Sequence, residues 1–436
     1  MPPSGLFGHD SSSKLRQERA PAFLGLLSKY GTVASICLVM LSSASCASKW
    51  KITGPLTDAR AEHTATTLPD GTVLVAGGYN ETTVLASTER YNPASGVWTR
   101  TAPMNVPRSG HTATLLPDGT VLVTGGFEHK KDFYPIDSTE RYNPATNTWT
   151  LSKPMHLKRG LHLAILLSQG RVLLIGCGPN QSVNNQRSVE LYDAASDSWT
   201  QMSPSKLAHT RGSANLQLDG TVVVAGGAEE TPTPGAGISM VAYSERYDPA
   251  SNTWSEIALL NESPYAQTAT VINDVTILLV GGRNTGQTYK GAIRYQPQLR
   301  NGTNYQSNLW QQTADMITAR SNHQENLLAN GTVIVTGGFY GCVDLGPHKG
   351  CGGSLAAVES FAPSVDDSVN GAWTAQDEMF NERGDHTATV VTVSQNDCRL
   401  MVAGGFAWDF SVGQRTLNQV ELFPVPCPRP SGPLRR

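Results

Sequence analysis

The chain has 436 residues, of which 42 are glycine and 26 are proline, and only 16% of its residues are charged. This composition favours many short strands and turns. The formal net charge of −3 argues against a nucleic-acid-binding protein, because that class carries a basic stripe or patch.

Residues 1–47 have the character of an export signal. Basic residues between Lys14 and Lys29 precede an apolar stretch at residues 31–41, which is too short for a transmembrane span. The small residues that follow resemble a bacterial lipobox, in which Cys46 would be lipidated. Ser43 departs from that pattern, which prefers leucine three residues before the cysteine, and ordinary cleavage after Ala47 is the alternative. We therefore expect an exported protein, either secreted or held as a lipoprotein at the cell envelope or outer surface.

The next segment predicts four short antiparallel strands. Residues 63–68 alternate in polarity, and Asp70-Gly71 forms a two-residue hairpin turn, since glycine tolerates positive φ. Residues 72–76 are an apolar run, as expected of a strand buried on both faces. A third strand follows at residues 87–91, and a turn at Asn92-Pro93 leads to a fourth.

These landmarks recur about every 50 residues. Each apolar run ends in a pair of small residues, at Gly77-Gly78, Gly125-Gly126, Gly176-Cys177, Gly226-Gly227, Gly281-Gly282, Gly337-Gly338 and Gly404-Gly405. An aromatic residue joins every copy, at Tyr91, Tyr142, Tyr192, Tyr247, Tyr295, Phe361 and Phe423. Tryptophan recurs at Trp50, Trp98, Trp149, Trp199, Trp254, Trp310 and Trp373. A period of this length indicates a repeat architecture.

An apolar run, a double glycine, then tyrosine and tryptophan resemble the kelch repeat, over residues 50–426. The resemblance implies an all-β fold, a seven-bladed kelch β-propeller similar to the central domain of galactose oxidase. We expect the glycines where neighbouring blades approach closely, and the aromatic residues packed between blades. The predicted domains are the export signal (1–47), the propeller (48–426) and a Pro-rich C-terminal tail (427–436).

The two ends of the repeat region predict how the ring closes. The last copy ends with a strand at Phe423 and lacks its tryptophan, whereas Trp50 lacks a preceding tyrosine strand. The N-terminal strand should therefore complete the last blade, which removes the exposed edges of an open array.

The cysteines fit an oxidising compartment. Cys342 and Cys351 lie within one long insertion and could form a disulfide. Strand directions place Cys398 and Cys427 at the same end of the last blade, so they could also pair. Cys177 replaces a repeat glycine and is expected to be a buried free thiol, although spacing alone does not prove connectivity.

One face of the propeller carries the long, unequal insertions, and we call it the loop-rich face. The insertions lie between the second and third strands of a blade, at residues 128–134, 229–240, 339–355 and 406–418. They include aromatic residues that most other blades lack at those positions, namely Tyr340, Trp408 and Phe410. These loops either cover the channel mouth or form a contact surface for a protein or glycan.

Five blades also present an arginine followed three residues later by histidine on this face. The arginines are Arg60, Arg108, Arg159, Arg320 and Arg383. The kelch resemblance implies that such arginines can hold acidic partners, and pairing between blades is the structural alternative. The histidines are expected to be hydrogen-bonding groups of the repeat, because a metal site needs ligands that converge on one point.

Two function classes follow. The first is a non-enzymatic, exported binding scaffold that presents the loop-rich face to a protein or glycan. The second is a kelch-propeller enzyme, either a copper radical oxidase of the galactose oxidase type or a sugar mutarotase or epimerase. The oxidase's copper tyrosine would precede an inner strand, where this chain has Glu62, Gly110, Leu161, Asn322 and Asp385. We predict a monomer with no catalytic residues, metal or cofactor, no nucleic-acid partner, and membrane contact only through a lipid anchor.

Overall fold

The computed structural model describes residues 48–129, 134–178, 182–230, 238–260, 262, 264–272, 275–297, 309–341, 352–364, 371–409 and 413–428. Several predictions lie outside these residues: the export signal at 1–47 with Cys46, the Cys342–Cys351 pair, Phe410, and the tail beyond Pro428.

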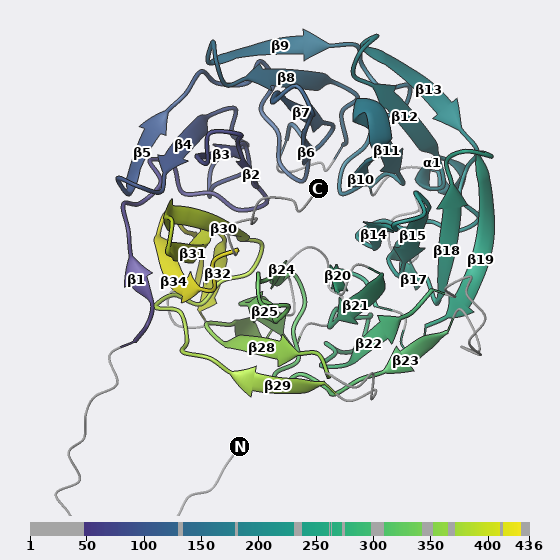
Figure 1. Cartoon of the computed structure of the whole chain (residues 1–436). Helices are drawn as coiled ribbons and strands as arrows, with labels where there is room; N and C mark the ends of the chain where they lie inside the picture. Colours follow the sequence, from purple (N-terminus) through teal and green to yellow (C-terminus); the bar gives the residue numbers. More distant parts are fainter. Residues whose placement is uncertain are drawn as a thin grey trace, which may run out of the picture. The chain divides into compact units, whose positions relative to one another are not determined.

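The described residues form seven four-stranded antiparallel sheets around a central axis (Figure 1). This confirms the predicted all-β, seven-bladed propeller. Among the same residues no helix is long and apolar enough to cross a membrane. The helical elements described are a turn of 3-10 helix at Ser168–Gly170 and a short helix, α1 (Val183–Gln186), both in blade 3.

Each blade runs from an inner strand at the axis to an outer strand at the rim. Blade 1 comprises β2 (Thr64–Thr67), β3 (Val73–Ala76), β4 (Thr88–Asn92) and β5 (Val97–Arg100). Blade 2 comprises β6 (Thr112–Leu115), β7 (Val121–Thr124), β8 (Thr139–Asn143) and β9 (Thr148–Ser152). Blade 3 comprises β10 (Leu163–Leu166), β11 (Arg171–Ile175), β12 (Val189–Asp193) and β13 (Ser198–Met202). Blade 4 comprises β14 (Ser213–Leu216), β15 (Val222–Ala225), β18 (Tyr243–Asp248) and β19 (Thr253–Leu259).

The remaining blades follow the same order. Blade 5 comprises β20 (Thr268–Ile272), β21 (Thr276–Val280), β22 (Ala292–Tyr295) and β23 (Trp310–Gln312). Blade 6 comprises β24 (Gln324–Leu327), β25 (Val333–Thr336), β28 (Val358–Ala362) and β29 (Ala372–Ala375). Blade 7 comprises β30 (Thr387–Ser394), β31 (Asp397–Ala403), β34 (Val420–Val425) and β1 (Lys51–Ile52).

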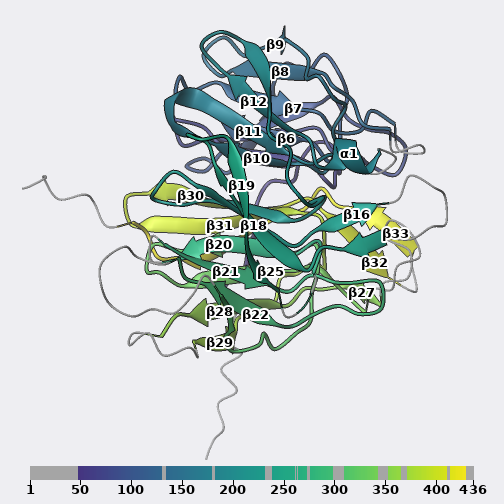
Figure 2. The ribbon, with the colours of Figure 1, turned by 90° about the vertical axis from the view of Figure 1, so that its right-hand side faces the viewer.

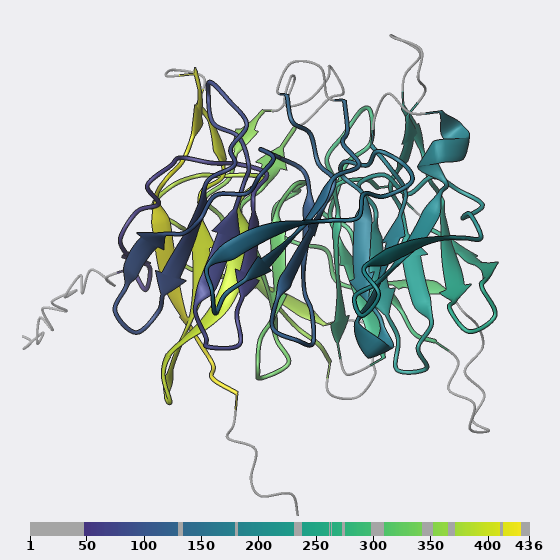
Figure 3. The same ribbon diagram turned by 90° about the horizontal axis from the view of Figure 1, so that it is seen from above.

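Three of the insertions form small hairpins of their own. These are β16 (Ala228–Glu230) with β17 (Ile238–Met240), β26 (Phe339–Tyr340) with β27 (Gly353–Ser354), and β32 (Phe406–Asp409) with β33 (Gly413–Thr416). They gather with α1 at one side of the ring in Figure 2. Figure 3 shows the blades edge-on, with the longer loops at this face and tight turns at the opposite one. We call the opposite one the hairpin face.

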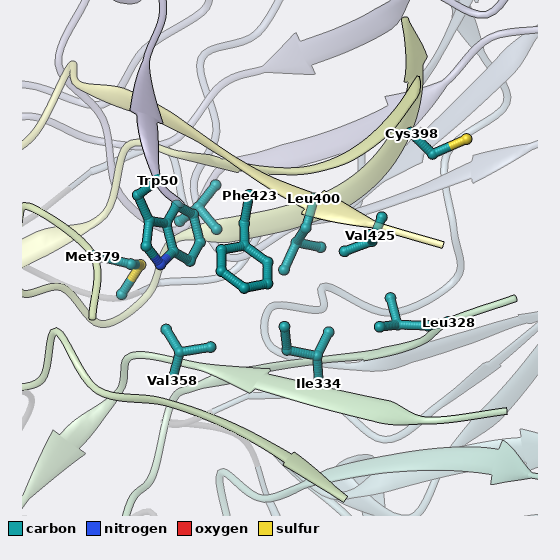
Figure 4. Close-up of a cluster of buried hydrophobic side chains, with 10 residues drawn as sticks. Trp50, Leu328, Ile334, Val358, Met379, Cys398, Leu400, Phe423 and Val425 are labelled. Atoms are coloured by element: carbon teal, nitrogen blue, oxygen red, sulfur yellow. The ribbon is translucent and has the colours of Figure 1, made fainter. Parts of the chain in front are cut away.

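The core consists of apolar layers between adjacent blades. The second strand of each blade is almost entirely buried, as in β3, where all four residues are inaccessible. Between blades 6 and 7, Trp50 and Phe423 pack against Ile334 and Val358 (Figure 4). In the six other blades the tyrosine or phenylalanine stacks on the tryptophan of the neighbouring strand, with ring centroids 4.9–5.4 Å apart. The tyrosine or phenylalanine also joins the apolar layer of the preceding blade, as Tyr91 does with Met401 and Ala403 of blade 7, so these residues pack between blades, as predicted.

The two ends of the chain close the ring. Strand β1 pairs antiparallel with β34, with Lys51 opposite Leu422. Trp50 is only 2% exposed, and its indole N–H donates a hydrogen bond to the Asp377 carbonyl at 2.7 Å. A disulfide joins Cys398 to Cys427 and fastens the last strand to β31. Closure by the N-terminal strand and this pairing were both predicted.

The double glycines lie where neighbouring backbone leaves no room for a side chain. A Cβ added to Gly77 would lie 2.4 Å from the Arg108 carbonyl oxygen of the next blade. One added to Gly78 would lie 2.6 Å from the Ala61 carbonyl oxygen. Both residues have positive φ, at 61° and 91°, which glycine adopts without strain. The pair therefore allows each blade to approach its neighbour at the loop-rich face.

Candidate functional site: the loop-rich face and the channel mouth

The five repeat arginines are completely buried beneath the loop-rich face, and each is paired with a glutamate of its own blade's third strand. The guanidinium–carboxylate distances are 2.9 Å for Arg60–Glu89, 2.8 Å for Arg108–Glu140, 2.8 Å for Arg159–Glu190, 2.5 Å for Arg320–Glu359 and 2.5 Å for Arg383–Glu421.

Blade 1 shows how one such buried pair is satisfied. The Arg60 guanidinium donates to the carbonyl oxygens of Gly77 at 2.6 Å and Ser87 at 3.0 Å. The Glu89 carboxylate also accepts the backbone N–H groups of Thr57 and Asp58. Burial lowers the pKa of Arg60, while the charge of Glu89 opposes that shift. An arginine with so high a starting pKa remains charged, so the network is ionic and fully hydrogen-bonded.

The ligand-binding role considered for Arg60, Arg108, Arg159, Arg320 and Arg383 is therefore wrong. Their side chains have no exposed area, and a partner could reach them only by opening the propeller. The structural alternative holds, although each salt bridge lies within a blade. The contact between blades is made instead by the arginine backbone, as when Gly78 donates its N–H to the Arg108 carbonyl at 2.8 Å.

Blades 4 and 5 lack the buried arginine–glutamate pair. His209 takes the arginine position of blade 4 and contacts Glu245. In blade 5, Pro264 takes the arginine position and Ile293 the glutamate position. Where the cation is absent the buried anion is absent too, as expected because an unpaired buried charge is costly.

The five repeat histidines link adjacent blades. Each Nε2 atom lies within hydrogen-bond distance of a threonine hydroxyl of the preceding blade, in the pairs His63–Thr387, His111–Thr64, His162–Thr112, His323–Thr268 and His386–Thr336. Burial, followed by the charge of nearby arginine, lowers the pKa of every one, to about 3 for His162. They are therefore neutral hydrogen-bonding groups of the repeat, as predicted.

The mouth of the central channel is a closed ring of seven residues, one from each blade. They are Glu62, Gly110, Leu161, Arg211, Ala266, Asn322 and Asp385, and all seven have φ between 50° and 59°. Each donates its backbone N–H to the carbonyl oxygen of its counterpart in the preceding blade, at 2.8–3.3 Å, and Glu62 closes the ring on Asp385. We call these seven residues the channel mouth.

A cavity of about 470 Å³ opens at the channel mouth, and all seven residues line it. Asn322 donates its side-chain N–H to the Asp385 carboxylate at 2.7 Å. Burial and the charge of Asp385 together raise the pKa of Glu62 to about 7, and Arg211 opposes this shift. The sequence-based prediction for five of these positions concerned only a copper-binding tyrosine, and it did not include the cluster. In the sequence, the cluster is marked by a charged residue directly before the repeat histidine of blades 1 and 7.

The residues present do not fit a copper site of the galactose oxidase type. None of the seven channel-mouth residues is a tyrosine, and the nearby histidines use Nε2 on threonine hydroxyls. Within the described part of the chain, no three His, Cys, Asp or Glu side chains are placed to hold a metal ion. The donor chemistry therefore gives no basis for copper catalysis.

A second hollow, of about 610 Å³, lies on the loop-rich face between blades 5 and 6. Its lining includes Gln287, Ile317, Tyr340 and Leu355. Ile317 is 60% exposed and Tyr340 is 42% exposed, and the same inter-blade loop one blade later leaves Phe380 53% exposed. In the sequence, the signal for this hollow is an apolar residue directly after Met316 and Met379. The corresponding loops of blades 1 to 3 have a polar residue there.

The aromatic residues predicted for this face have different positions. Tyr340 lines the hollow just described. Trp408 is half-buried against Phe339 and Phe406, and its backbone N–H donates to the Ser354 hydroxyl at 3.0 Å. Trp408 therefore joins the hairpins of blades 6 and 7, whereas Tyr340 is 42% exposed.

Comparisons with known proteins agree with this architecture. The family model described as the KLHDC2/KLHL20/DRC7 Kelch-repeats domain matches residues 17–227. Kelch-like protein 35 of Mus musculus is 26% identical over 163 residues, which are 37% of this chain and 26% of that protein. Kelch-like protein 15 of Homo sapiens is 26% identical over 275 residues, 60% of this chain and 41% of that protein. The chain thus spans less than half the length of these relatives.

Among solved structures, the chain is similar to a fungal alcohol oxidase of the AA5 family in complex with copper. The TM-score is 0.65 at 16% sequence identity, over 87% of this chain and 76% of that one. At this identity the likeness concerns the fold alone.

Proposed function

We propose that this chain, a kelch-repeat β-propeller, is a non-enzymatic scaffold that binds a protein ligand on its loop-rich face. Kelch propellers generally serve protein–protein interaction. The observation that carries the proposal is the apolar hollow between blades 5 and 6, with Ile317 and Tyr340 exposed at its edge. Large apolar side chains grouped beside a concave surface are typical of contact sites.

The rest of the molecule supports a binding role by contrast. The obvious reactive groups of the repeat would be its arginines and histidines. Their side chains form structural hydrogen bonds instead. The insertions vary between blades at this face, and they rest on a rigid ring of sheets. A rigid scaffold with variable loops is suited to recognition.

A site-specific crosslinking experiment tests the proposal. A photoreactive amino acid at position 340 should capture a protein in the cells that produce this chain, whereas one at position 218 on the hairpin face should not. Leu218 is a matched control because it is also apolar and is 76% exposed. The captured protein, once purified, should then bind the wild-type propeller and bind Ile317→Ser at least about tenfold more weakly, as expected for a contact at the centre of an interface.

Two results would contradict the proposal. Equal capture from both positions would mean that the hollow is not selective. Binding to a glycan array without any protein capture would identify a carbohydrate ligand in place of a protein.

We also propose that the protein is exported and held at a membrane through a lipid on Cys46. The support is the basic and apolar pattern of residues 1–47, together with the short distance in sequence from Cys46 to Trp50, which is buried in blade 7. Such a tether would hold the hairpin face towards the membrane and leave the loop-rich face outward. A Cys46→Ser protein should be recovered in the soluble fraction. If it remains with the membrane, the anchor is refuted.

A further inference from the structure

The channel mouth has an uneven distribution of charge. Blades 6, 7 and 1 contribute Asn322, Asp385 and Glu62 in succession around the ring, and these three form an acidic arc. Arg211 of blade 4 is the one cationic residue among the seven, so the ring carries a formal charge of −1 when both carboxylates are ionised. The other three positions, Gly110, Leu161 and Ala266, are small or apolar.

In this arc and next to it, two amide oxygens are buried without a hydrogen-bond partner among the described residues. They are Asn322 Oδ1 and Gln267 Oε1, and both side chains line the same cavity. Gln267 is only 6% exposed, and its amide nitrogen already donates to the Ala225 carbonyl at 2.9 Å. Unsatisfied buried acceptors are rare, because each costs the free energy of its lost hydration. Their presence in a cavity indicates a ligand that donates hydrogen bonds.

We infer that the channel mouth binds an organic cation, an ammonium or guanidinium group, through Glu62, Asp385 and the amide oxygens of Asn322 and Gln267. The cation would be neutralised by the acidic arc and would donate to the amide oxygens. Leu161 and Ala266 would contact the carbon chain that carries it, as apolar surfaces do for lysine and arginine stems. The group could belong to a small amine or to a basic side chain of a bound protein.

An organic cation fits this site better than a metal ion. A cavity of about 470 Å³ is much larger than one ion needs. Calcium takes six to eight oxygen ligands at short range, whereas no three carboxylate, histidine or cysteine side chains of the described residues are grouped to hold a metal. The burial and mutual repulsion that raise the pKa of Glu62 are also what a neighbouring cation would relieve.

Calorimetric titration of the full chain with N-acetyl-arginine amide tests this inference, and N-acetyl-norleucine amide serves as the neutral analogue. Saturable binding of the arginine derivative alone is expected. Glu62→Gln and Asp385→Asn should each weaken it about tenfold, which is the worth of one hydrogen bond to a charged group. Arg211→Gln should strengthen it, because it removes the opposing charge. Glu378→Gln is the matched control, since it removes an exposed carboxylate of the same face and should change nothing.

Opposite effects of Asp385→Asn and Arg211→Gln separate a binding role from a loss of folding, even if Glu62→Gln fails to fold. Equal binding of the neutral analogue would overturn the inference. So would calcium chloride binding that displaces the arginine derivative, because the site would then be a metal site. The test uses no macromolecular partner, so its result is independent of the function proposed above.

Discussion

The imidazole of His209 lies 2.9 Å from the carboxylate of Glu245, measured from Nε2 to Oε2, and neither side chain is exposed. Its Nδ1 atom lies 2.7 Å from the carbonyl oxygen of Gly226. Both ring nitrogens therefore lie within hydrogen-bond distance of an oxygen atom, one on a carboxylate and one on the backbone. The His209 imidazole thus takes, in blade 4, the place of the guanidinium that five other blades bury against glutamate.

The first prediction concerns this replacement. His209→Arg should keep or raise the free energy of unfolding. In five other blades an arginine at this position contacts the equivalent glycine carbonyl and the equivalent glutamate, as Arg60 does in blade 1. His209→Ala should lower it by about 3–5 kcal/mol, because it leaves Glu245 charged, buried and unpaired. Urea denaturation of both variants measures the difference. A stable alanine variant would mean that Glu245 has another partner.

The second prediction concerns the buried salt bridges. Arg320→Met and Glu359→Leu should each cost about 3–5 kcal/mol, because each leaves one buried charge alone. The double variant should cost clearly less than the sum, since blade 5 manages with Pro264 and Ile293 at these positions. Lys290→Met is the control. Its pair with Asp315 is exposed, so the change should stay below about 1 kcal/mol. Additive losses would argue that the two charges are solvated separately.

The third prediction concerns pH. Glu325 occupies an inner-strand position at which the other six blades have alanine, and burial raises its pKa to about 8 against the effect of Thr268 and Thr270 hydroxyls. A carboxyl whose folded pKa lies above the unfolded value of 4.5 keeps a proton that unfolding releases. The contribution of Glu325 to the free energy of unfolding is therefore complete below pH 4.5. It is lost as the pH rises towards 8, by about 1.4 kcal/mol for each pH unit.

Glu325→Ala removes this titration and restores the repeat residue. The variant should therefore unfold at a higher urea concentration than the wild type at pH 8, and the gap should narrow as the pH approaches 4.5. Two stability profiles that run parallel over this range would show that Glu325 is not the group responsible.

The fourth prediction concerns ring closure. Trp50→Ala should lower the free energy of unfolding by about 3–5 kcal/mol, because it empties a site in the layer between blades 6 and 7. Deleting residues 48–56 should be worse and lead to aggregation, because it exposes the edge of β34. Ile52→Ala serves as control, since Ile52 also belongs to β1 but is 63% exposed. A deletion variant that melts like the chain without the deletion would refute closure by the N-terminal strand.

Much of the fold was predictable because each blade repeats the same local chemistry. The double glycines, the tyrosine–tryptophan pairs and the tight turns gave seven blades. The unmatched Trp50 and Phe423 then identified the strand that closes the ring, and strand direction alone placed Cys398 beside Cys427. The pairing of the buried arginines with glutamates could also have been predicted from the sequence. In every blade that has the buried arginine, a glutamate stands two residues before the repeat tyrosine or phenylalanine. Blade 5 lacks both the arginine and the glutamate.

The channel mouth and the apolar hollow could not be predicted in this way. By itself the sequence determined the repeat, the blade count and the residues that pack between blades, because those interactions join neighbouring strands. Tertiary structure decided that Glu62 and Asp385, from the first and last blades, are adjacent, and that Arg211 shares their cavity. The physical reason is closure. Only when β1 pairs with β34 do the seven inner strands surround one axis and bring distant residues together at its mouth.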